Sequence, residues 1–299
     1  MDYNYFFNTY DFQPTIGFDS REKQAQDAGV DSELCQMFGY GYYDCENPPT
    51  PPQPQPSTPK CLTFTVESLG DKENTFDMCI EVDAKEEPVI PTLEYSTDNG
   101  TTWSSYTFTE QSGEPIVLDT VGATVMFRGN NESLGTEFQS VQFVISQGTA
   151  AASGDVTSLL NGVGGDIPAP AYCYVNMFHG CTSLTQAPAL PATTLADYCY
   201  NDMFNGCTSL VQAPALPAET LAEGCYNKMF DGCTSLNYVK AMFLTNIVTN
   251  YDTYTSGWLF NVAGEGTFVA NVLATWPIEI LKPDGSTIPD GWTVQTASE

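Results

Sequence analysis

Basic residues are scarce in this chain: its 299 residues include only 9 Lys and Arg against 37 Asp and Glu, and the formal net charge is −28. Proteins that bind nucleic acid need a basic surface to neutralise phosphates, and anionic membranes attract basic segments rather than acidic ones. We therefore expect no nucleic acid and no membrane among the partners. The acidic excess favours the solubility of an exposed, concentrated protein, with a specific cation-binding role as the alternative.

Catalytic signatures are almost absent as well. The only histidine is His179, and the equivalent positions of the repeat described below hold Asn205 and Asp231, so a polar turn residue explains it better than a general base. No Gly-x-Ser-x-Gly elbow, phosphate loop or His-Glu-x-x-His motif occurs. Acidic pairs carry no weight as a glycosidase couple, because among 37 carboxylates some pair falls at the right separation by chance. The sequence therefore predicts no enzyme activity, no cofactor and no metal site.

Long hydrophobic runs are missing too. No stretch approaches the roughly 18 apolar residues that a membrane-spanning helix needs. Residues 1–7 have neither the basic region nor the sustained apolar core of a secretory signal, and the first positive charge is Arg21. We therefore expect the chain to be made and folded in a cytoplasm.

A repeat of 26 residues is the strongest positive feature. The pattern Cys-Tyr-x-x-Met-Phe-x-Gly-Cys-Thr-Ser-Leu occurs at 173–184, 199–210 and 225–236, and the first two copies continue with Ala-Pro-Ala-Leu-Pro. Such a period predicts a solenoid, whose stacked copies share a core and leave a broad outer surface that suits binding. Within a copy we expect a short helix over 198–204 and a short strand over 208–214 that stacks in parallel with its equivalents.

The chain contains ten cysteines, and six of them belong to the repeat. In a stack they form two columns, which favours buried thiols over disulfides. The Cys-x7-Cys spacing does not match a zinc knuckle, whose ligands are closer in sequence. The columns contain Cys173, Cys199 and Cys225 in one and Cys181, Cys207 and Cys233 in the other.

Two segments precede the β-rich part of the chain. Prolines dominate residues 48–60, which predicts a stiff polyproline spacer of ~40 Å. Residues 1–47 are aromatic without a clear hydrophobic period, which predicts an arm that docks on a partner; the alternative is an element that packs on the rest of this chain. The first aromatic residues of this arm are Tyr3, Tyr5, Phe6, Phe7, Tyr10 and Phe12.

Residues 61–148 predict a small Ig-like β-sandwich. Apolar and polar residues alternate over 62–66, and Asn99-Gly100 separates two strand-like runs, which indicates a hairpin. Further strand-like runs follow at 116–118, 124–127 and 138–145. Residues 149–299 then hold the solenoid, and its exposed ends need caps. We expect the sandwich to cover the first end and Trp258, Phe260 and Trp292, with a turn at 288–291, to close the other.

The repeat, with its Ala-Pro-x-Leu-Pro-Ala-x-Thr-Leu tail, resembles BspA-type leucine-rich repeats. Such repeats are common in surface proteins of gut Bacteroidales and in structural proteins of their phages, including crAss-like phages. The flanking stretches 95–103, 127–130, 152–160, 266–268 and 288–294 resemble the modules around such repeats, so the resemblance covers about residues 61–298. The third copy departs from it because it lacks the Ala-Pro-x-Leu-Pro tail. The resemblance implies attachment or display and brings no catalytic residues.

Together these features predict a mainly β structural protein of a phage virion, most simply a capsid-mounted head fibre. The arm at 1–47 would dock on a capsid or other virion protein, and the solenoid would bind a host-surface or mucosal glycan or protein. A homotrimer is expected only by analogy with other fibres. The alternatives are a bacterial cell-surface adhesin, a phage tail fibre and a carbohydrate-active enzyme. Candidate ligand-stacking rings are Tyr174, Tyr200 and Tyr226, unless they pack in the core beside the cysteines.

Overall fold

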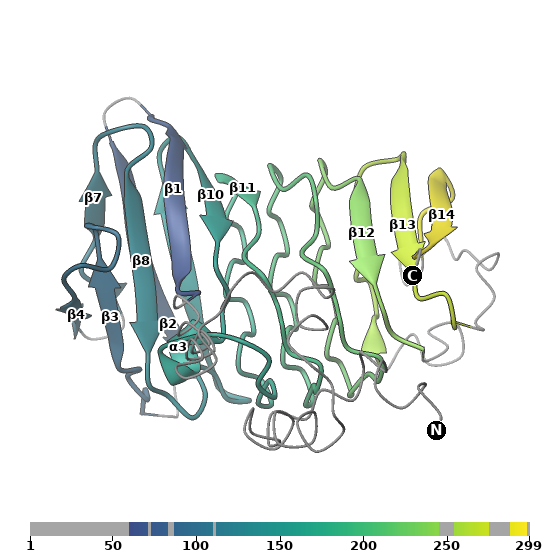
Figure 1. The fold of residues 1–299 in the computed structure, drawn as a ribbon, viewed down its shortest axis with the longest axis horizontal. Coiled ribbons are helices and arrows are strands. Elements are labelled where there is room, and N and C mark those ends of the chain that lie inside the picture. Colours follow the sequence, from purple (N-terminus) through teal and green to yellow (C-terminus); the bar gives the residue numbers. More distant parts are fainter. Residues whose placement is uncertain are drawn as a thin grey trace, which may run out of the picture. The chain divides into compact units, whose positions relative to one another are not determined.

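The computed structural model describes residues 60–70, 73–82, 87–109, 112–244, 254–274 and 288–297. The described chain is mainly β, with several sheets, none of them closed, and a single four-residue helix, α3 (Ser158–Asn161) (Figure 1). All the described residues belong to one compact unit. The predicted docking arm and residues 48–59 of the predicted spacer lie outside the described residues.

The larger sheet contains six strands in the order β11-β10-β1-β8-β3-β4. Strand β1 follows the alternation in the sequence, because Leu62, Phe64 and Val66 are buried while the threonines between them are half-buried. The strands are β1 (Leu62–Ser68), β3 (Leu93–Ser96), β4 (Ser104–Tyr106), β8 (Thr124–Gly129), β10 (Thr149–Ser153) and β11 (Leu184–Gln186).

The predicted hairpin is confirmed: β3 and β4 pair antiparallel on either side of Asn99 and Gly100. Both turn residues adopt left-handed backbone angles, with φ of 57° and 80°. The Asp98 carboxylate accepts hydrogen bonds from Ser96 and Thr102, and these bonds lower the pKa of Asp98 to about 2. The turn is therefore held by its own side chains and is longer than a two-residue loop.

The second sheet contains five strands and faces the first across a core of phenylalanine rings. Phe64 on β1 lies 5.5 Å from Phe76 and 5.2 Å from Phe143 between ring centroids, and Phe127 on β8 lies 5.3 Å from Phe143. The order is β5-β6-β2-β7, with β9 on the other edge of β2. The strands are β2 (Asn74–Val82), β5 (Phe108–Thr109), β6 (Ser112–Gly113), β7 (Ile116–Leu118) and β9 (Gln139–Ser146).

The repeat copies consist of successive turns, and the helix predicted over 198–204 is wrong. Every fourth residue of this segment is left-handed, as at Tyr198 (φ 55°) and Asp202 (φ 53°), which interrupts any helix. Every second amide group of this segment bonds to the next copy, and the others close turns within their own copy. Tyr174 N donates to Cys199 O over 2.9 Å, and Phe178 N donates to Met203 O over 2.8 Å.

Parallel pairing occurs on the other side of the copies, but the strand predicted over 208–214 is wrong, because the second copy forms only isolated bridges in this region. Strand β11 of the first copy pairs in parallel with β10, and the third copy forms β12 (Tyr238–Ala241). The second copy has only isolated bridges there, at Gln212 and Leu216. Strand β12 begins a three-stranded parallel sheet with β13 (Gly266–Ala270) and β14 (Trp292–Thr296).

Equivalent side chains of the copies lie above one another. The rings of Phe143, Phe178, Phe204 and Phe230 form one column with successive centroid distances of 5.5, 5.2 and 5.6 Å. Three methionines form another column in which every side chain is fully buried. They are Met177, Met203 and Met229.

The two facing sheets lie against the first copy. Strand β9 supplies Phe143, which stands where a copy would place its own phenylalanine, and its amide donates to Met177 O over 2.7 Å. The Cys181 thiol donates to Phe143 O over 3.0 Å, and Cys207 makes the same contact with Phe178 O at 3.0 Å. The first copy therefore meets β9 as each later copy meets the one before it.

A fourth turn that lacks the consensus residues covers the other end. Phe230 N donates to Trp258 O over 2.9 Å, and the left-handed Gly257 and Asn261 follow Lys228 and Gly232 by 29 residues. Trp258 and Trp292 are buried as expected. The expectation for Phe260 is wrong, since its side chain is 40% exposed. Phe260 follows the column of His179, Asn205 and Asp231, which faces outward.

Candidate functional site

The three tyrosines considered for sugar stacking lie inside the core. Tyr174, Tyr200 and Tyr226 are 0–1% exposed, and their rings stack on one another at 5.4 and 6.1 Å between centroids. A ring without exposed surface cannot stack on a sugar, so the sugar-stacking interpretation is corrected and core packing applies. Burial raises the pKa of all three phenols well above the usual value. The proposed docking-arm aromatics lie outside the described residues.

Two other tyrosines reach the surface, each directly before the first cysteine of its copy. Tyr172 and Tyr198 are half-buried and stack at 5.2 Å with an angle of 8° between ring planes. Gly224 takes the third position, and the ring of Tyr198 lies directly over it, so both faces of that ring are covered. The Tyr198 hydroxyl donates to Glu223 over 3.1 Å, and this bond raises the pKa of Tyr198. These rings stabilise the stack and leave no free face at Tyr198 for a ligand.

A polar groove crosses the start of the three-stranded parallel sheet. Register places Gln212, Tyr238, Thr267 and Thr293 in one row, each beside the next on neighbouring chain segments. Neighbouring strands are about 4.8 Å apart, so the row presents polar groups at that interval. The groove has a volume of about 580 Å³. Its lining, which defines the polar groove below, is Gln212, Asn237, Tyr238, Glu265, Gly266, Thr267, Gly291 and Thr293.

The groove contains amide, hydroxyl and carboxylate groups and one aromatic ring. No side-chain hydrogen bond within the described residues engages Gln212, Thr267, Thr293 or Glu265, so these groups remain available to a ligand. Such a set suits a hydroxyl-rich, uncharged ligand, because amides and carboxylates bind hydroxyls and an aromatic ring provides apolar contact. The sequence alone could not place these four chain segments side by side.

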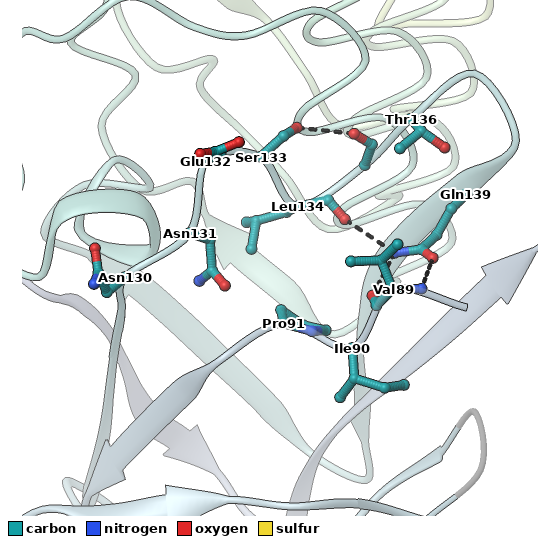
Figure 2. A pocket seen from close by; sticks show the side chains of 11 residues that line it. Val89, Ile90, Pro91, Asn130, Asn131, Glu132, Ser133, Leu134, Thr136 and Gln139 are labelled. Carbon is teal, nitrogen blue, oxygen red and sulfur yellow. Dashed lines mark hydrogen bonds between the residues drawn. The ribbon is translucent and has the colours of Figure 1, made fainter. Parts of the chain in front are cut away.

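A second, half-open pocket lies where the loop 130–136 meets the segment 89–91, and Figure 2 shows its side chains. Its volume is about 370 Å³. The Gln139 side chain accepts a hydrogen bond from Val89 N at 2.7 Å and donates to Val89 O at 2.8 Å. Asn131 holds the backbone of Thr92 in the same way, at 2.8 and 3.0 Å. These two amides fix the wall of the pocket.

The repeat cysteines are free thiols in the core, as predicted. Burial raises the pKa of Cys173 to about 11 and the pKa of Cys181, Cys225 and Cys233 to about 12. Burial also raises the pKa of Cys199 and Cys207 well above the usual value. A protonated, enclosed thiol is a poor nucleophile and a poor metal ligand, so these cysteines act as core residues.

Thiol labelling should separate the repeat cysteines from the others. In the native protein at pH 8, we expect iodoacetamide to leave all six repeat cysteines unmodified, because they are buried and protonated. Cys79, which is half-buried, should react faster. Peptide mass spectrometry with and without denaturant measures the extent of labelling at each cysteine. Fast labelling of Cys199 or Cys207 in the native protein would contradict the packed column.

Other kinds of site were sought over the same residues. Among the described ranges, no three His, Cys, Asp or Glu side chains come together to hold a metal ion. Within those ranges no helix has the length and apolar character to cross a bilayer. No protein-family model, curated protein or solved structure matches this chain.

Proposed function

We propose that this chain is a non-enzymatic structural protein of a phage virion, a head fibre that displays a repeat domain for attachment to host-surface or mucosal glycans. The two facing sheets are then an Ig-like sandwich, and the stacked copies are a leucine-rich-repeat-like solenoid. The observation that carries the proposal is the in-register stack between Phe143 and Trp258. Because equivalent residues of successive copies lie side by side, their outward polar groups form rows.

The polar groove is the proposed attachment surface. It is the place in the described residues where a row of unengaged amides and hydroxyls adjoins an aromatic ring, Tyr238. The stack supports a linear ligand, since equivalent groups recur across successive strands at a constant interval. The resemblance to BspA-type repeats of Bacteroidales phages supports the virion setting and the glycan class.

Docking on the particle is proposed for residues 1–47, with the proline-rich spacer holding the folded body away from the capsid. Deleting residues 1–47 should abolish incorporation into particles while the repeat domain still folds, measured by mass spectrometry of purified particles. Normal incorporation of the truncated protein would remove the arm from the proposal. Recovery of the intact protein in bacterial surface fractions, with none in particles, would contradict a virion protein and indicate a bacterial cell-surface adhesin.

The groove offers a matched pair of variants for the binding test. Gln212 lines the polar groove, and Gln186 is its equivalent 26 residues earlier, equally exposed but outside the groove. Gln212→Ala together with Tyr238→Ala should weaken binding to purified mucin glycans or host capsular polysaccharide about tenfold or more (~1.4 kcal/mol). Gln186→Ala should leave the Kd unchanged. Equal losses in both variants would show that the groove is not the attachment surface.

The non-enzymatic part has its own measurement. Incubation of the protein with the same capsular polysaccharide should release no new reducing ends. Release that depends on intact protein would assign the chain to the carbohydrate-active enzymes instead.

A further inference from the structure

The half-open pocket contains two kinds of group that the described residues leave unengaged. Val89 and Ile90 at its edge are 66% and 46% exposed, so their apolar surface remains in water. Glu132 in the opposite loop is exposed, and no hydrogen bond or ion pair joins its carboxylate to the described residues. A pocket edged by apolar surface and ending at a free carboxylate suits a ligand that is aliphatic along its length and cationic at its tip.

The pocket is preformed, because its walls are held by the protein itself. Gln139 and Asn131 fix the backbone of the segment 89–92 through four hydrogen bonds between 2.7 and 3.0 Å. On the opposite side Gly135 lies against the carbonyl oxygen of Tyr172, where a side chain would not fit. A ligand entering this pocket therefore meets fixed walls, which lowers the entropy cost of binding.

We propose that this pocket receives a single lysine or arginine side chain from a protein partner. The aliphatic stem would pack on Val89, Ile90 and Pro91, and the cation would meet Glu132. Charge complementarity supports this occupant, since the chain carries a net charge of −28 and Glu137 adjoins the same loop. The inference goes beyond attachment to glycans and does not depend on it.

An uncharged sugar suits this pocket less well than the polar groove. Its amides, Gln139 and Asn131, are already engaged with backbone groups, so few free donors remain. An anionic ligand is disfavoured by Glu132 because the pocket lining includes no cationic side chain to offset it.

The test uses short capped peptides, Gly-Lys-Gly, Gly-Arg-Gly and Gly-norleucine-Gly, titrated into the full-length protein. Norleucine has the stem of lysine without the charge. We expect saturable NMR shifts at millimolar concentrations for the amides of residues 130–136 with the lysine or arginine peptide and none with norleucine. The stronger of the two cationic peptides identifies the preferred side chain. Monovalent peptides are needed because polylysine would bind any acidic surface.

The matched variants separate this pocket from the general charge. Glu132→Gln should raise the Kd of the cationic peptide about threefold or more, as expected for loss of a partly exposed ion pair. Glu114→Gln removes the same charge at an exposed position outside the pocket lining and should leave the Kd of the peptide unchanged. Equal binding by Glu132→Gln and the parent protein, absence of any shift, or shifts with a neutral monosaccharide instead would each overturn the proposal.

Discussion

Raising the pH from 9 to 12 should unfold this protein cooperatively. An unfolded thiol ionises near pH 9, whereas the buried thiols of Cys181, Cys225 and Cys233 have pKa values of about 12. Above pH 9 the unfolded chain therefore loses protons that the folded chain retains, so stability falls as the pH rises. A shift of three units corresponds to about 4 kcal/mol for each thiol, against a total stability of about 5–15 kcal/mol for a typical domain.

The buried phenols act in the same direction. Tyr174, Tyr200 and Tyr226 also have raised pKa values, so their stabilising contribution is complete at neutral pH and disappears in strongly alkaline solution. Circular dichroism at increasing pH reports the unfolding, and tyrosinate absorbance should rise in the same step. Phenol ionisation without loss of structure would contradict the packed tyrosine column.

A conservative substitution tests which thiols are responsible. Cys207 donates to Phe178 O over 3.0 Å, and Cys207→Ser keeps a donor there but removes the ionisable thiol. This variant should unfold at a higher pH than the parent, although the smaller oxygen slightly lowers stability at pH 7. Cys79→Ser, at a half-buried position, should leave the alkaline midpoint unchanged.

Phe204→Ala should be the most destabilising single truncation in the second copy. The ring is fully buried and stacks between Phe178 at 5.2 Å and Phe230 at 5.6 Å. Truncation of a buried phenylalanine costs about 3–5 kcal/mol. For a unit of this size the melting temperature should fall by about 6–20 °C, measured by calorimetry.

The control for this truncation lies in the same copy. Val211 is 43% exposed, and Val211→Ala should change the melting temperature little. Phe204→Leu keeps part of the side-chain volume, so its melting temperature should lie between those of Phe204→Ala and Val211→Ala. A loss from Phe204→Ala no larger than that from Val211→Ala would mean that the ring column does not hold the copies together.

Strand positions in residues 61–148 were predictable because their signals are local. Alternation over Leu62–Val66 and the Asn99-Gly100 turn both follow from the preferences of neighbouring residues. The helix predicted over 198–204 failed for the opposite reason. Every second amide of this segment bonds to the next copy, and these long-range bonds override the helical preference of the local sequence.

The candidate site was less predictable than the fold. Tyr174 and its equivalents were recognisable as a column, but whether a column faces inward or outward depends on the path of the backbone. The polar groove joins Gln212 to Thr293, which are far apart in sequence and share no motif. No local pattern indicates that these residues meet.

The sequence by itself determined the 26-residue period, the identity of the stacked residues and the strongly acidic character, because each of these depends only on the order and type of the residues. Only the tertiary structure decided the ends of the stack. Phe143 supplies the column's own residue type from a strand outside the repeat, whereas Trp258 stands where the copies have methionine, since packing requires shape and backbone register as well as residue identity. The groove and the half-open pocket arise in the same way, from segments that become neighbours only after the chain has folded.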